Sequence, residues 1–291
     1  MKLLVKFNLI YVGVMALGLA VSGLMARSLL VDNAQEEVLN TARMLIDKAN
    51  AVRGYTTNQI TKLLDTQMKY EFLPQSVPSY SATEVLGTLQ KTYPDYLYKE
   101  AALNPTNPRD RAVGWEVDVV NQFRANPDLP EYSGRRETAT GASIYLAKPL
   151  RITNPACLQC HSSVDAAPKT MVDRYGAANG FGWNFNEVIG AQLVSVPLAL
   201  PMQRAEKSFK VLIGSLVGVF VVVGIVLNLM IWLVVVRPVT QLSALADRVS
   251  QGDLAAPEFP ATGSRDEIGV LAASFSRMRT SVVQAMKMLE P

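Results

Sequence analysis

The two cysteines and the single histidine of the 291-residue chain fall within five consecutive residues, Cys157-Leu158-Gln159-Cys160-His161. Two thiols three residues apart can reach the two vinyl groups of one porphyrin, and the residue that follows can project its imidazole toward the iron. This C-x-x-C-H pattern is the attachment sequence of c-type haem. It predicts one covalent haem c, with thioether bonds from Cys157 and Cys160 and with His161 as the proximal axial ligand.

Two other chemistries use the same residue types. A zinc site would need a fourth ligand from Asp or Glu, because the chain holds no other Cys or His. A redox-active C-x-x-C dithiol usually opens a helix in a thioredoxin-like βαβ pattern, whereas here Pro155 precedes the motif and that pattern is absent. The motif therefore favours haem over both, and a chain of this length with two cysteines is not a disulfide scaffold.

The second axial position of the iron has several candidate ligands. Bis-histidine ligation within the chain is excluded, which leaves Met68, Met171, Tyr55 or no protein ligand at all. Met171 follows the motif in the same irregular stretch and could fold back over the ring, although a methionine more often fills a gap in a core. An open position would let a small gas bind, whereas a firm methionine ligand would raise the potential and favour redox reporting.

Haem propionates are anionic, and arginine suits bidentate pairing with carboxylates. Four arginines of the same region are candidate partners: Arg53, Arg135, Arg136 and Arg151. We expect one or two of them to contact a propionate and the others to be solvated surface charges. The sequence presents neither a catalytic acid–base pair nor a nucleophile with its base, so we expect no enzymatic activity.

The composition of the chain points to a membrane protein. The chain is 49% hydrophobic, and its net charge of only +3 gives no sign of a nucleic-acid-binding surface. Uncharged runs extend over residues 7–26 and 211–236, and each is long enough to span a hydrocarbon core. A cleaved signal peptide is the alternative for the first run, but its apolar region would be shorter, and Leu24 is a poor residue for a cleavage site.

These two runs divide the chain into parts. Lys2 and Lys6 favour a cytoplasmic amino terminus, so the sequence predicts a two-pass protein of a bacterial inner membrane with its main domain in the periplasm. Attachment of c-type haem occurs outside the cytoplasm in bacteria, which agrees with this topology. The expected parts are a cytoplasmic tail (1–6), a transmembrane helix (7–28), a periplasmic haem domain (29–208), a second transmembrane helix (209–236) and a carboxy-terminal module (237–291).

The large region between the two runs is predicted to mix helices and strands. Residues 29–68 carry apolar side chains at helical spacing and continue the first run outward. Strands and helices do not alternate regularly, so the expected fold class is α+β, with strands beside flanking helices, and not a doubly wound sheet. Further helices are expected over 82–92 and 115–123, and strands over 97–103, 131–140, 143–149 and 189–198.

The carboxy-terminal module consists of two amphipathic patterns. Arg237-Pro238 opens the first, which Gly252 ends, and Asp266-Glu267 opens the second with acids at its amino end. Apolar residues of the second then recur at coiled-coil spacing: Ile268, Leu271, Phe275, Met278, Val282, Ala285 and Leu289. Two short helices joined by an extended connector after a spanning helix resemble a HAMP domain over residues 237–291. The resemblance implies a parallel four-helix bundle in a homodimer.

The region outside the membrane resembles a family of haem-c-binding, PAS-like sensor domains that is catalogued as a domain of unknown function. The resemblance covers roughly residues 33–200 and implies a central antiparallel sheet, a long amino-terminal helix and a haem pocket on the sheet face. Some members use a further cysteine as the second axial ligand, and this chain has none. The matching residues are Tyr93-Pro94-Asp95-Tyr96, Glu100 to Pro108, Trp115-Glu116, the C-x-x-C-H motif and Val188-Ile189-Gly190-Ala191.

Together these features predict a transmembrane sensor. Its haem would change redox state or bind a small gas, and HAMP would choose between two packings and pass the change to a cytoplasmic signalling partner in trans. The alternative is a membrane-anchored monohaem c-type cytochrome that exchanges electrons with a periplasmic donor, which would leave the HAMP segment unexplained. A third hypothesis is a chemoreceptor fragment whose haem is only structural.

Overall fold

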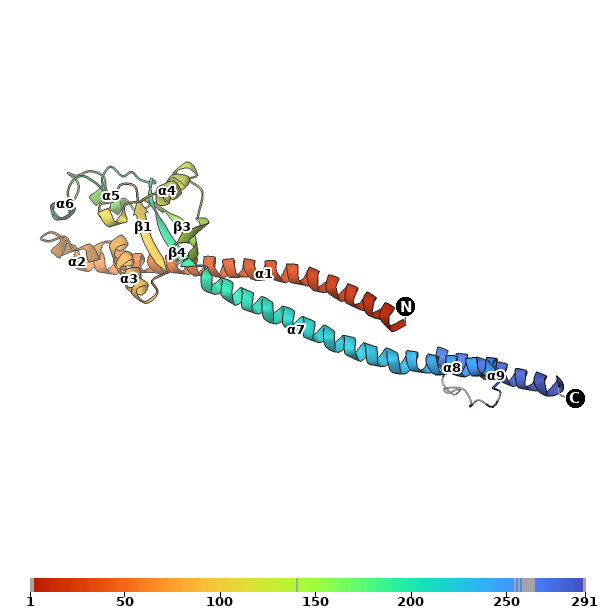
Figure 1. The fold of residues 1–291 in the computed structure, drawn as a ribbon. Coiled ribbons are helices and arrows are strands. Elements are labelled where there is room, and N and C mark those ends of the chain that lie inside the picture. Colours follow the sequence, from red (N-terminus) through yellow and green to blue (C-terminus); the bar gives the residue numbers. More distant parts are fainter. Residues whose placement is uncertain (1–2, 140, 254, 256, 258–264, 290–291) are drawn as a thin grey trace. The chain divides into compact units, whose positions relative to one another are not determined.

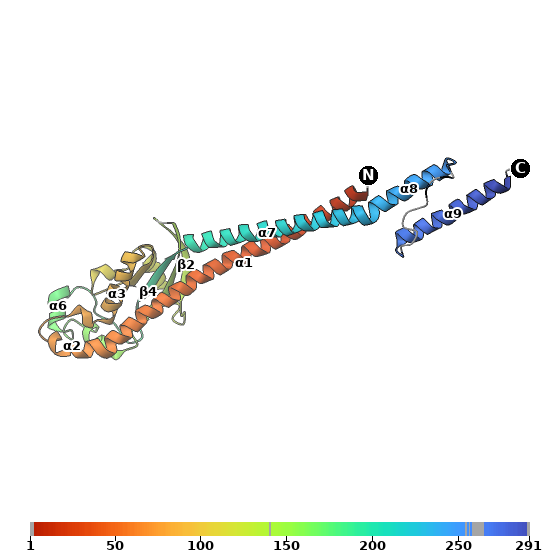
Figure 2. The same ribbon diagram turned by 90° about the horizontal axis from the view of Figure 1, so that it is seen from below.

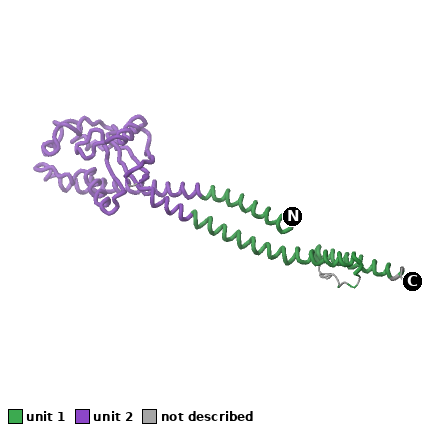
Figure 3. Tube along the Cα trace, in the orientation of Figure 1, with its two compact units in different colours: residues 1–26, 209–291 green, residues 27–208 purple. Residues whose placement is uncertain are grey.

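The computed structural model describes residues 3–139, 141–253, 255, 257 and 265–289. The chain forms two compact units (Figure 3): residues 27–208, here called the sheet unit, and residues 1–26 with 209–291, here called the helical unit. Lys2 and most of the predicted connector after Gly252 lie outside the described residues, as does the side chain of Leu289.

A four-stranded antiparallel sheet forms the centre of the sheet unit (Figure 1). β2 and β3 form a hairpin that turns at Gly141, whose φ of 112° suits glycine. β4 then enters between β3 and β1, so that Glu100 of β1 lies opposite Gln192. The predicted α+β class with an antiparallel sheet is confirmed. The strands are β1 (Leu97–Ala102), β2 (Tyr132–Thr138), β3 (Gly141–Arg151) and β4 (Val188–Pro197).

Helices cover both faces of this sheet (Figure 1). On one face lies α1 (Leu3–Tyr55), and on the other lies α4 (Trp115–Ala125). Each helix and its sheet face share one apolar core, which removes the strand side chains from water on both sides and stabilises the unit. The core under α1 includes Val38, Ala42, Ile46, Leu146 and Val194, and the core under α4 includes Val120, Phe123, Ala147, Ala191 and Leu193.

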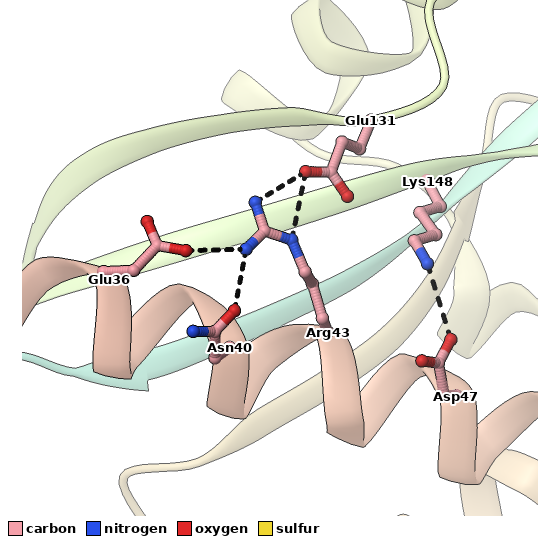
Figure 4. Close-up of polar contacts among 6 residues, drawn as sticks. All are labelled: Glu36, Asn40, Arg43, Asp47, Glu131 and Lys148. Carbon is pink, nitrogen blue, oxygen red and sulfur yellow. Dashed lines mark hydrogen bonds and ion pairs between the residues drawn. The ribbon is translucent and has the colours of Figure 1, made fainter.

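Polar side chains also fasten α1 to the sheet (Figure 4). Arg43 donates to the same oxygen of Glu131 from Nε at 3.2 Å and from Nη2 at 2.9 Å, and it donates to Glu36 at 3.2 Å. Lys148 of β3 approaches Asp47 at 3.4 Å. Ion pairs as exposed as these contribute about 0–1 kcal/mol each, so the apolar core supplies most of the stability.

The helix predicted over residues 29–68 is present, but it contains one wide turn. A π-helical turn (Thr56–Ile60) joins α1 to α2 (Thr61–Met68). The hydroxyl of Thr56 donates to the Val52 carbonyl at 2.9 Å, and that of Thr61 donates to the Thr56 carbonyl, also at 2.9 Å. Such side-chain bonds compete with the regular backbone ladder and favour a local distortion.

Two helices differ slightly from their expected bounds. The C-x-x-C-H motif lies in a region of several short helices. α3 spans Pro78–Thr92 and begins before Ala82, because proline fits the first turn of a helix, where its missing N–H needs no partner. α4 extends two residues past the expected end at Phe123. The remaining short helices are η2 (Pro74–Ser76), η3 (Pro108–Asp110), η4 (Pro155–Cys157), α5 (Leu158–His161) and α6 (Lys169–Tyr175).

Two helical stretches of the chain, Leu3–Met68 and Ala199–Ser250, are long and apolar enough to cross a membrane by length and composition. The second consists of α7 (Ala199–Ile231), a π-helical turn (Trp232–Val236) and α8 (Arg237–Ser250). Within the helical unit the two stretches are joined by a reciprocal amide pair. Asn8 donates to Asn228 Oδ1 at 2.7 Å, and Asn228 donates to Asn8 Oδ1 at 2.8 Å.

The carboxy-terminal part of the helical unit pairs α8 with α9 (Glu267–Leu289), and Figure 2 shows these two helices side by side. Asp266 caps α9 by accepting a hydrogen bond from the Gly269 N–H at 2.7 Å. Leu242 of α8 and Ala272 of α9 are buried between the helices, with Phe275 packed against them. Other predicted seam residues remain exposed in the single chain: Leu271, Met278 and Val282.

Candidate functional site

The C-x-x-C-H motif lies in a short helical segment, here called the motif turn, which consists of η4 and α5 and begins at Pro155, after a three-residue link from β3. Asn154 starts this turn, because its side chain accepts a hydrogen bond from the Ala156 N–H at 3.0 Å. Cys157 and Cys160 are three residues apart in it, so their thiols lie on the same side of the turn. Both thiols are free and half-buried. The turn therefore offers two neighbouring sulfurs to one ligand.

Both thiols are held in the protonated form by their surroundings. Burial raises the pKa of the Cys157 thiol, which the guanidinium of Arg53 partly opposes. Burial also raises the pKa of Cys160, and neighbouring Cys157 adds to this effect. A thiol rather than a thiolate is thus present at neutral pH, the form that adds its S–H across a vinyl double bond.

His161 is held by a backbone carbonyl and an aromatic ring. Its Nδ1 lies 2.7 Å from the carbonyl oxygen of Gly180 and 3.4 Å from the Thr106 hydroxyl. Trp183 stacks on the imidazole with ring centroids 3.9 Å apart and an interplanar angle of 16°. Since a carbonyl only accepts, Nδ1 carries the proton and the Nε2 lone pair is left for a metal.

The electrostatics of this position agree with that tautomer. Burial lowers the pKa of His161, against the opposing effect of the Gly180 carbonyl. The ring is therefore neutral at pH 7, which is the state a metal needs in its ligand. Within the described part of the chain, Nε2 of His161 makes no hydrogen bond. Two thiols and one free imidazole nitrogen in a single turn are the donor set that a c-type haem requires.

The loop from Gly176 to Glu187 supplies the contacts of His161 and is itself anchored at the end of β1. Asn104 accepts a hydrogen bond from the Gly180 N–H at 3.1 Å and donates to the Phe181 carbonyl at 3.2 Å. Gly180 has φ of 86°, and a Cβ there would lie 2.0 Å from the Thr106 hydroxyl oxygen. Only glycine fits this close approach.

The four predicted propionate partners lie in different places. Arg53 at the end of α1 is paired with the buried carboxylate of Glu100, and it is close enough to Cys157 to act on its pKa. Arg151 donates to the carbonyls of Asn186 and Pro127 at 2.9 and 2.7 Å. The structure therefore brings Arg53 near the Cys157 thiol, and both guanidinium groups already have partners: Glu100 for Arg53 and two backbone carbonyls for Arg151.

Arg135 and Arg136 lie at the other end of the sheet from the motif. Arg135 is opposite Ile144 of β3, and Ile144 lies seven residues before Arg151, where β3 ends nearest the motif. About 24 Å of strand therefore separates Arg135 from that end of β3. Arg136 lies over the ring of Trp115, with its guanidinium carbon 3.8 Å from the ring centroid. Arg135 is exposed beside Glu137 at 3.4 Å. The structure does not bring these two arginines to the motif.

The three candidate sixth ligands also differ in their surroundings. Met68 at the end of α2 uses its sulfur as an acceptor, 3.1 Å from the Leu73 nitrogen. Met171 is buried in α6, whose Thr170 hydroxyl donates to the Met68 carbonyl at 3.1 Å. Tyr55 is 53% exposed. The Thr170 hydrogen bond thus places α6, which contains Met171, beside the end of α2, which contains Met68. Within the described residues, neither methionine sulfur makes a hydrogen bond with the imidazole of His161.

Comparison with known proteins places this architecture in a family. A family model described as Tll0287-like matches residues 31–197, more than half of the chain. The chain belongs to the Tll0287-like family. A HAMP domain model matches residues 230–284. One solved structure, described as the cyanobacterial heme-protein Tll0287, is 17% identical and covers 57% of this chain and 92% of its own, with a TM-score of 0.38. No curated protein matches the chain significantly.

The two family matches confirm the resemblances drawn from the sequence, in which a haem-protein-like domain precedes a HAMP domain. A Tll0287-like domain, two helices apolar enough to cross a membrane and a HAMP domain are the parts of a transmembrane sensor, and they indicate a sensor rather than an enzyme. The HAMP domain also indicates a signalling protein that dimerises.

Several residues of this Tll0287-like site are not evident from the sequence. Gly180 and Trp183 come from a loop without periodicity, and their contacts with His161 join residues about twenty apart. Asn104 and Thr106 lie in the stretch Glu100 to Pro108 that carries the family resemblance, but nothing in the sequence assigns them contacts at this site. The one available signal was the presence of a tryptophan in a loop rich in glycine and asparagine, where a large ring needs a packing partner.

Proposed function

We propose that this Tll0287-like chain is a transmembrane sensor that carries one c-type haem, bonded through Cys157 and Cys160 and ligated by His161. The redox state of the haem, or a small gas bound to it, is the signal. The haem domain lies in the periplasm of a bacterium, and HAMP relays the signal to a cytoplasmic partner protein.

One observation carries this proposal. The Gly180 carbonyl lies 2.7 Å from Nδ1 of His161, which leaves Nε2 as the lone-pair nitrogen, and the same motif turn carries two free thiols. A structural zinc site would need more ligands, and the described residues contain no group of three or more His, Cys, Asp or Glu that could hold a metal ion. The donor set fits a haem, because the macrocycle would supply the other iron ligands and the two cysteines would bond to the porphyrin and not to the metal.

Each residue of the site has a stated task. When bound, the haem would supply an iron that can change oxidation state and can bind a small gas. Cys157 and Cys160 would hold the haem through two thioethers, each formed by addition of one S–H group across one vinyl double bond. His161 presents Nε2 to the iron, and Trp183 holds the plane of its ring. Arg53 is the one of the four arginines that we propose for a propionate.

The path from this site to HAMP follows the chain. The motif turn follows β3 after a link of three residues, and β3 is paired with β4 from Ser143 to Arg151. β4 ends at Pro197, and α7 begins two residues later at Ala199. α7 continues through the π-helical turn into α8 of the HAMP domain. A change at the haem thus acts on a sheet that leads directly into the second apolar helix.

The decisive test is production of the full chain in a bacterium with and without the c-haem maturation machinery. We expect a haem-staining band that survives denaturation only with the machinery, and we expect Cys157→Ser/Cys160→Ser to abolish it. A denatured band without bound porphyrin would overturn the proposal. Reporter fusions at residue 160 test the periplasmic side independently, and a cytosolic signal there contradicts the topology.

A spectrum of the reduced protein with carbon monoxide then assigns the sixth position. If Met171 or Met68 holds the iron firmly, the reduced spectrum will change little when the gas is added. If no protein ligand is bound, carbon monoxide will shift the main absorption band at once. Met171→Leu and Met68→Leu are matched variants, because each removes a sulfur while retaining a side chain of similar volume.

A further inference from the structure

The loop that holds the proposed iron ligand is itself held by one side chain from the sheet. Asn104 follows β1 by two residues, and its amide makes two hydrogen bonds to the loop. It accepts from the N–H of Gly180 at 3.1 Å and donates to the carbonyl of Phe181 at 3.2 Å. The Gly180 N–H and the Phe181 carbonyl belong to the two peptide groups that flank the Gly180–Phe181 peptide. Because both flanking groups are held, the direction of the Gly180 carbonyl oxygen between them is fixed as well.

The imidazole has little freedom to follow if this carbonyl moves. Trp183 stacks on it at 3.9 Å, and the backbone N–H of Trp183 donates to the His161 carbonyl at 3.1 Å. The Gly182 N–H donates to the Ser162 carbonyl at 3.1 Å. The ring plane and the motif turn are therefore fixed by contacts that do not involve Asn104. Asn104 therefore controls the length and angle of the hydrogen bond between Nδ1 of His161 and the Gly180 carbonyl.

That bond determines how strong a ligand the imidazole is. A histidine whose N–H is given to a good acceptor gains negative charge on its other nitrogen, which stabilises the oxidised metal and lowers the potential. Partners of this kind typically change metal affinity by about 10–100-fold when removed. The longer contact of Nδ1, at 3.4 Å from the Thr106 hydroxyl, is too long to replace the 2.7 Å bond.

From these contacts we infer that Asn104 is a positioning residue for His161: it aims the Gly180 carbonyl at Nδ1 and so sets the tautomer of the imidazole and the redox potential of the iron. This inference rests on the proposed function only for the iron. The tautomer is a property of the chain without haem.

The experiment has one arm without haem. Because the chain contains a single histidine, full-length protein labelled with ¹⁵N-histidine and made without the maturation machinery gives the two ring nitrogens of His161 alone. We expect one tautomer, protonated at Nδ1, in the wild type. We expect Asn104→Ala to give a mixture of tautomers, and the matched variant Asn107→Ala to keep the wild-type signals. Asn107 caps η3 in the same turn by accepting a hydrogen bond from the Arg109 N–H, and within the described residues its side chain makes no hydrogen bond to Gly180.

The second arm uses the haem-loaded full chain. We expect Asn104→Ala to raise the midpoint potential by about 59 mV, which corresponds to a tenfold loss in the preference for oxidised over reduced iron. The iron–histidine stretching band in the resonance Raman spectrum should move to lower frequency. Asn107→Ala, which leaves both hydrogen bonds of Asn104 in place, should leave both unchanged.

The outcomes separate the two proposals. If Asn104→Ala retains the wild-type tautomer, potential and Raman band, the positioning role of Asn104 is wrong even though haem is bound. If the denatured wild-type band contains no porphyrin, the haem proposal fails, and the ¹⁵N spectra still decide whether Asn104 positions His161. Equal effects of Asn104→Ala and Asn107→Ala on the ¹⁵N signals would indicate general loosening of the turn and would overturn the inference.

Discussion

Arg53 at the end of α1 is ion-paired with Glu100 of β1, whose side chain is only 3% exposed. The pair belongs to a buried polar network, because the Tyr98 hydroxyl donates to Glu100 at 2.7 Å and Gln192 donates to Tyr98 at 3.1 Å. Gln192 also donates to Asn50 of α1 at 2.9 Å. The network joins the long helix to two strands beside the proposed haem site.

The first prediction concerns this ion pair. Arg53→Met should lower the free energy of unfolding of the sheet unit by about 3 kcal/mol, because it leaves the Glu100 carboxylate buried and uncompensated. The double variant Arg53→Met/Glu100→Gln should recover much of that loss. Thermal unfolding followed by circular dichroism measures both. A double variant as unstable as Arg53→Met alone would show that the loss comes from packing and not from the stranded charge.

The second prediction concerns pH and Asp110. Burial raises the pKa of Asp110 to about 6, with Arg109 opposing and Glu100 adding to the effect. This value lies above the pKa of an unfolded aspartate, so between about pH 4 and about pH 6 the folded state binds the proton more tightly than the unfolded state. The free energy of unfolding should therefore fall as pH rises from about 4 to about 6. Asp110→Asn should flatten this dependence and be the more stable form at pH 7.

Denaturant titrations at several pH values check the behaviour of Asp110, with Asp118→Asn as the control. Asp118 is an exposed acid of α4, and its replacement should leave the slope unchanged. A slope between pH 4 and 6 that persists in Asp110→Asn would assign it to another group.

The third prediction concerns the amide pair between the two apolar stretches. Asn8 and Asn228 each donate to the other, and Asn228 also donates to the Gly224 carbonyl at 2.9 Å. A double-mutant cycle with Asn8→Leu and Asn228→Leu should give a coupling energy of about 0.6 kcal/mol, a typical value for such bonds in membranes. Unfolding in bilayer-like micelles measures it. Strictly additive single effects would mean that the pair does not form in the membrane.

The fourth prediction concerns the seam of the HAMP helices. Leu271 is 41% exposed in the single chain, whereas its neighbour Ala272 is fully buried against α8. In a parallel dimer the exposed apolar side chains of α9 pack against the same side chains of the second chain. Leu271→Cys should therefore form a crosslink under mild oxidation, and Ala272→Cys should not. Leu242 is a poor position for this purpose, because α9 of the same chain buries it.

The crosslinking rate of Leu271→Cys should also depend on the state of the haem, because a sensor must give its output helix two arrangements. Membranes poised with ferricyanide contain the oxidised haem, and membranes poised with dithionite contain the reduced haem. A brief treatment with a thiol-specific crosslinker then measures the rate in each state. Equal rates in both would leave dimerisation intact and contradict the relay, in favour of a simple electron carrier.

The sequence predicts the fold well where periodicity reports burial. Of the six apolar positions that recur at helical spacing in the long first helix, five are buried: Ala34, Val38, Ala42, Leu45 and Ala49. The sixth, Leu30, is only partly buried. The motif is equally visible, because its chemistry depends on adjacent residues. The strands were found from alternation, and their bounds differ from the structure by one or two residues at most positions.

The surroundings of the motif could not be predicted in the same way. Sequence alone does not give strand register, so Arg135 and Arg136 could not be separated from Arg53 as charges near the motif, although the register places them at the far end of β3. The Gly180 carbonyl is a backbone atom, and any residue type carries one. Its contact with His161 depends on a loop conformation that local propensity does not encode.

The wide turn at Trp232–Val236 has a mechanical consequence for the helix that enters the HAMP domain. Each residue of an ordinary α-helix advances about 100° around the axis, and a π turn spreads its circuit over one residue more. If this turn tightened to regular spacing with no change in sequence, α8 would rotate by roughly a quarter of a revolution relative to α7. A change between the wide and the regular turn would therefore rotate α8 about its axis without any change in the length of the chain.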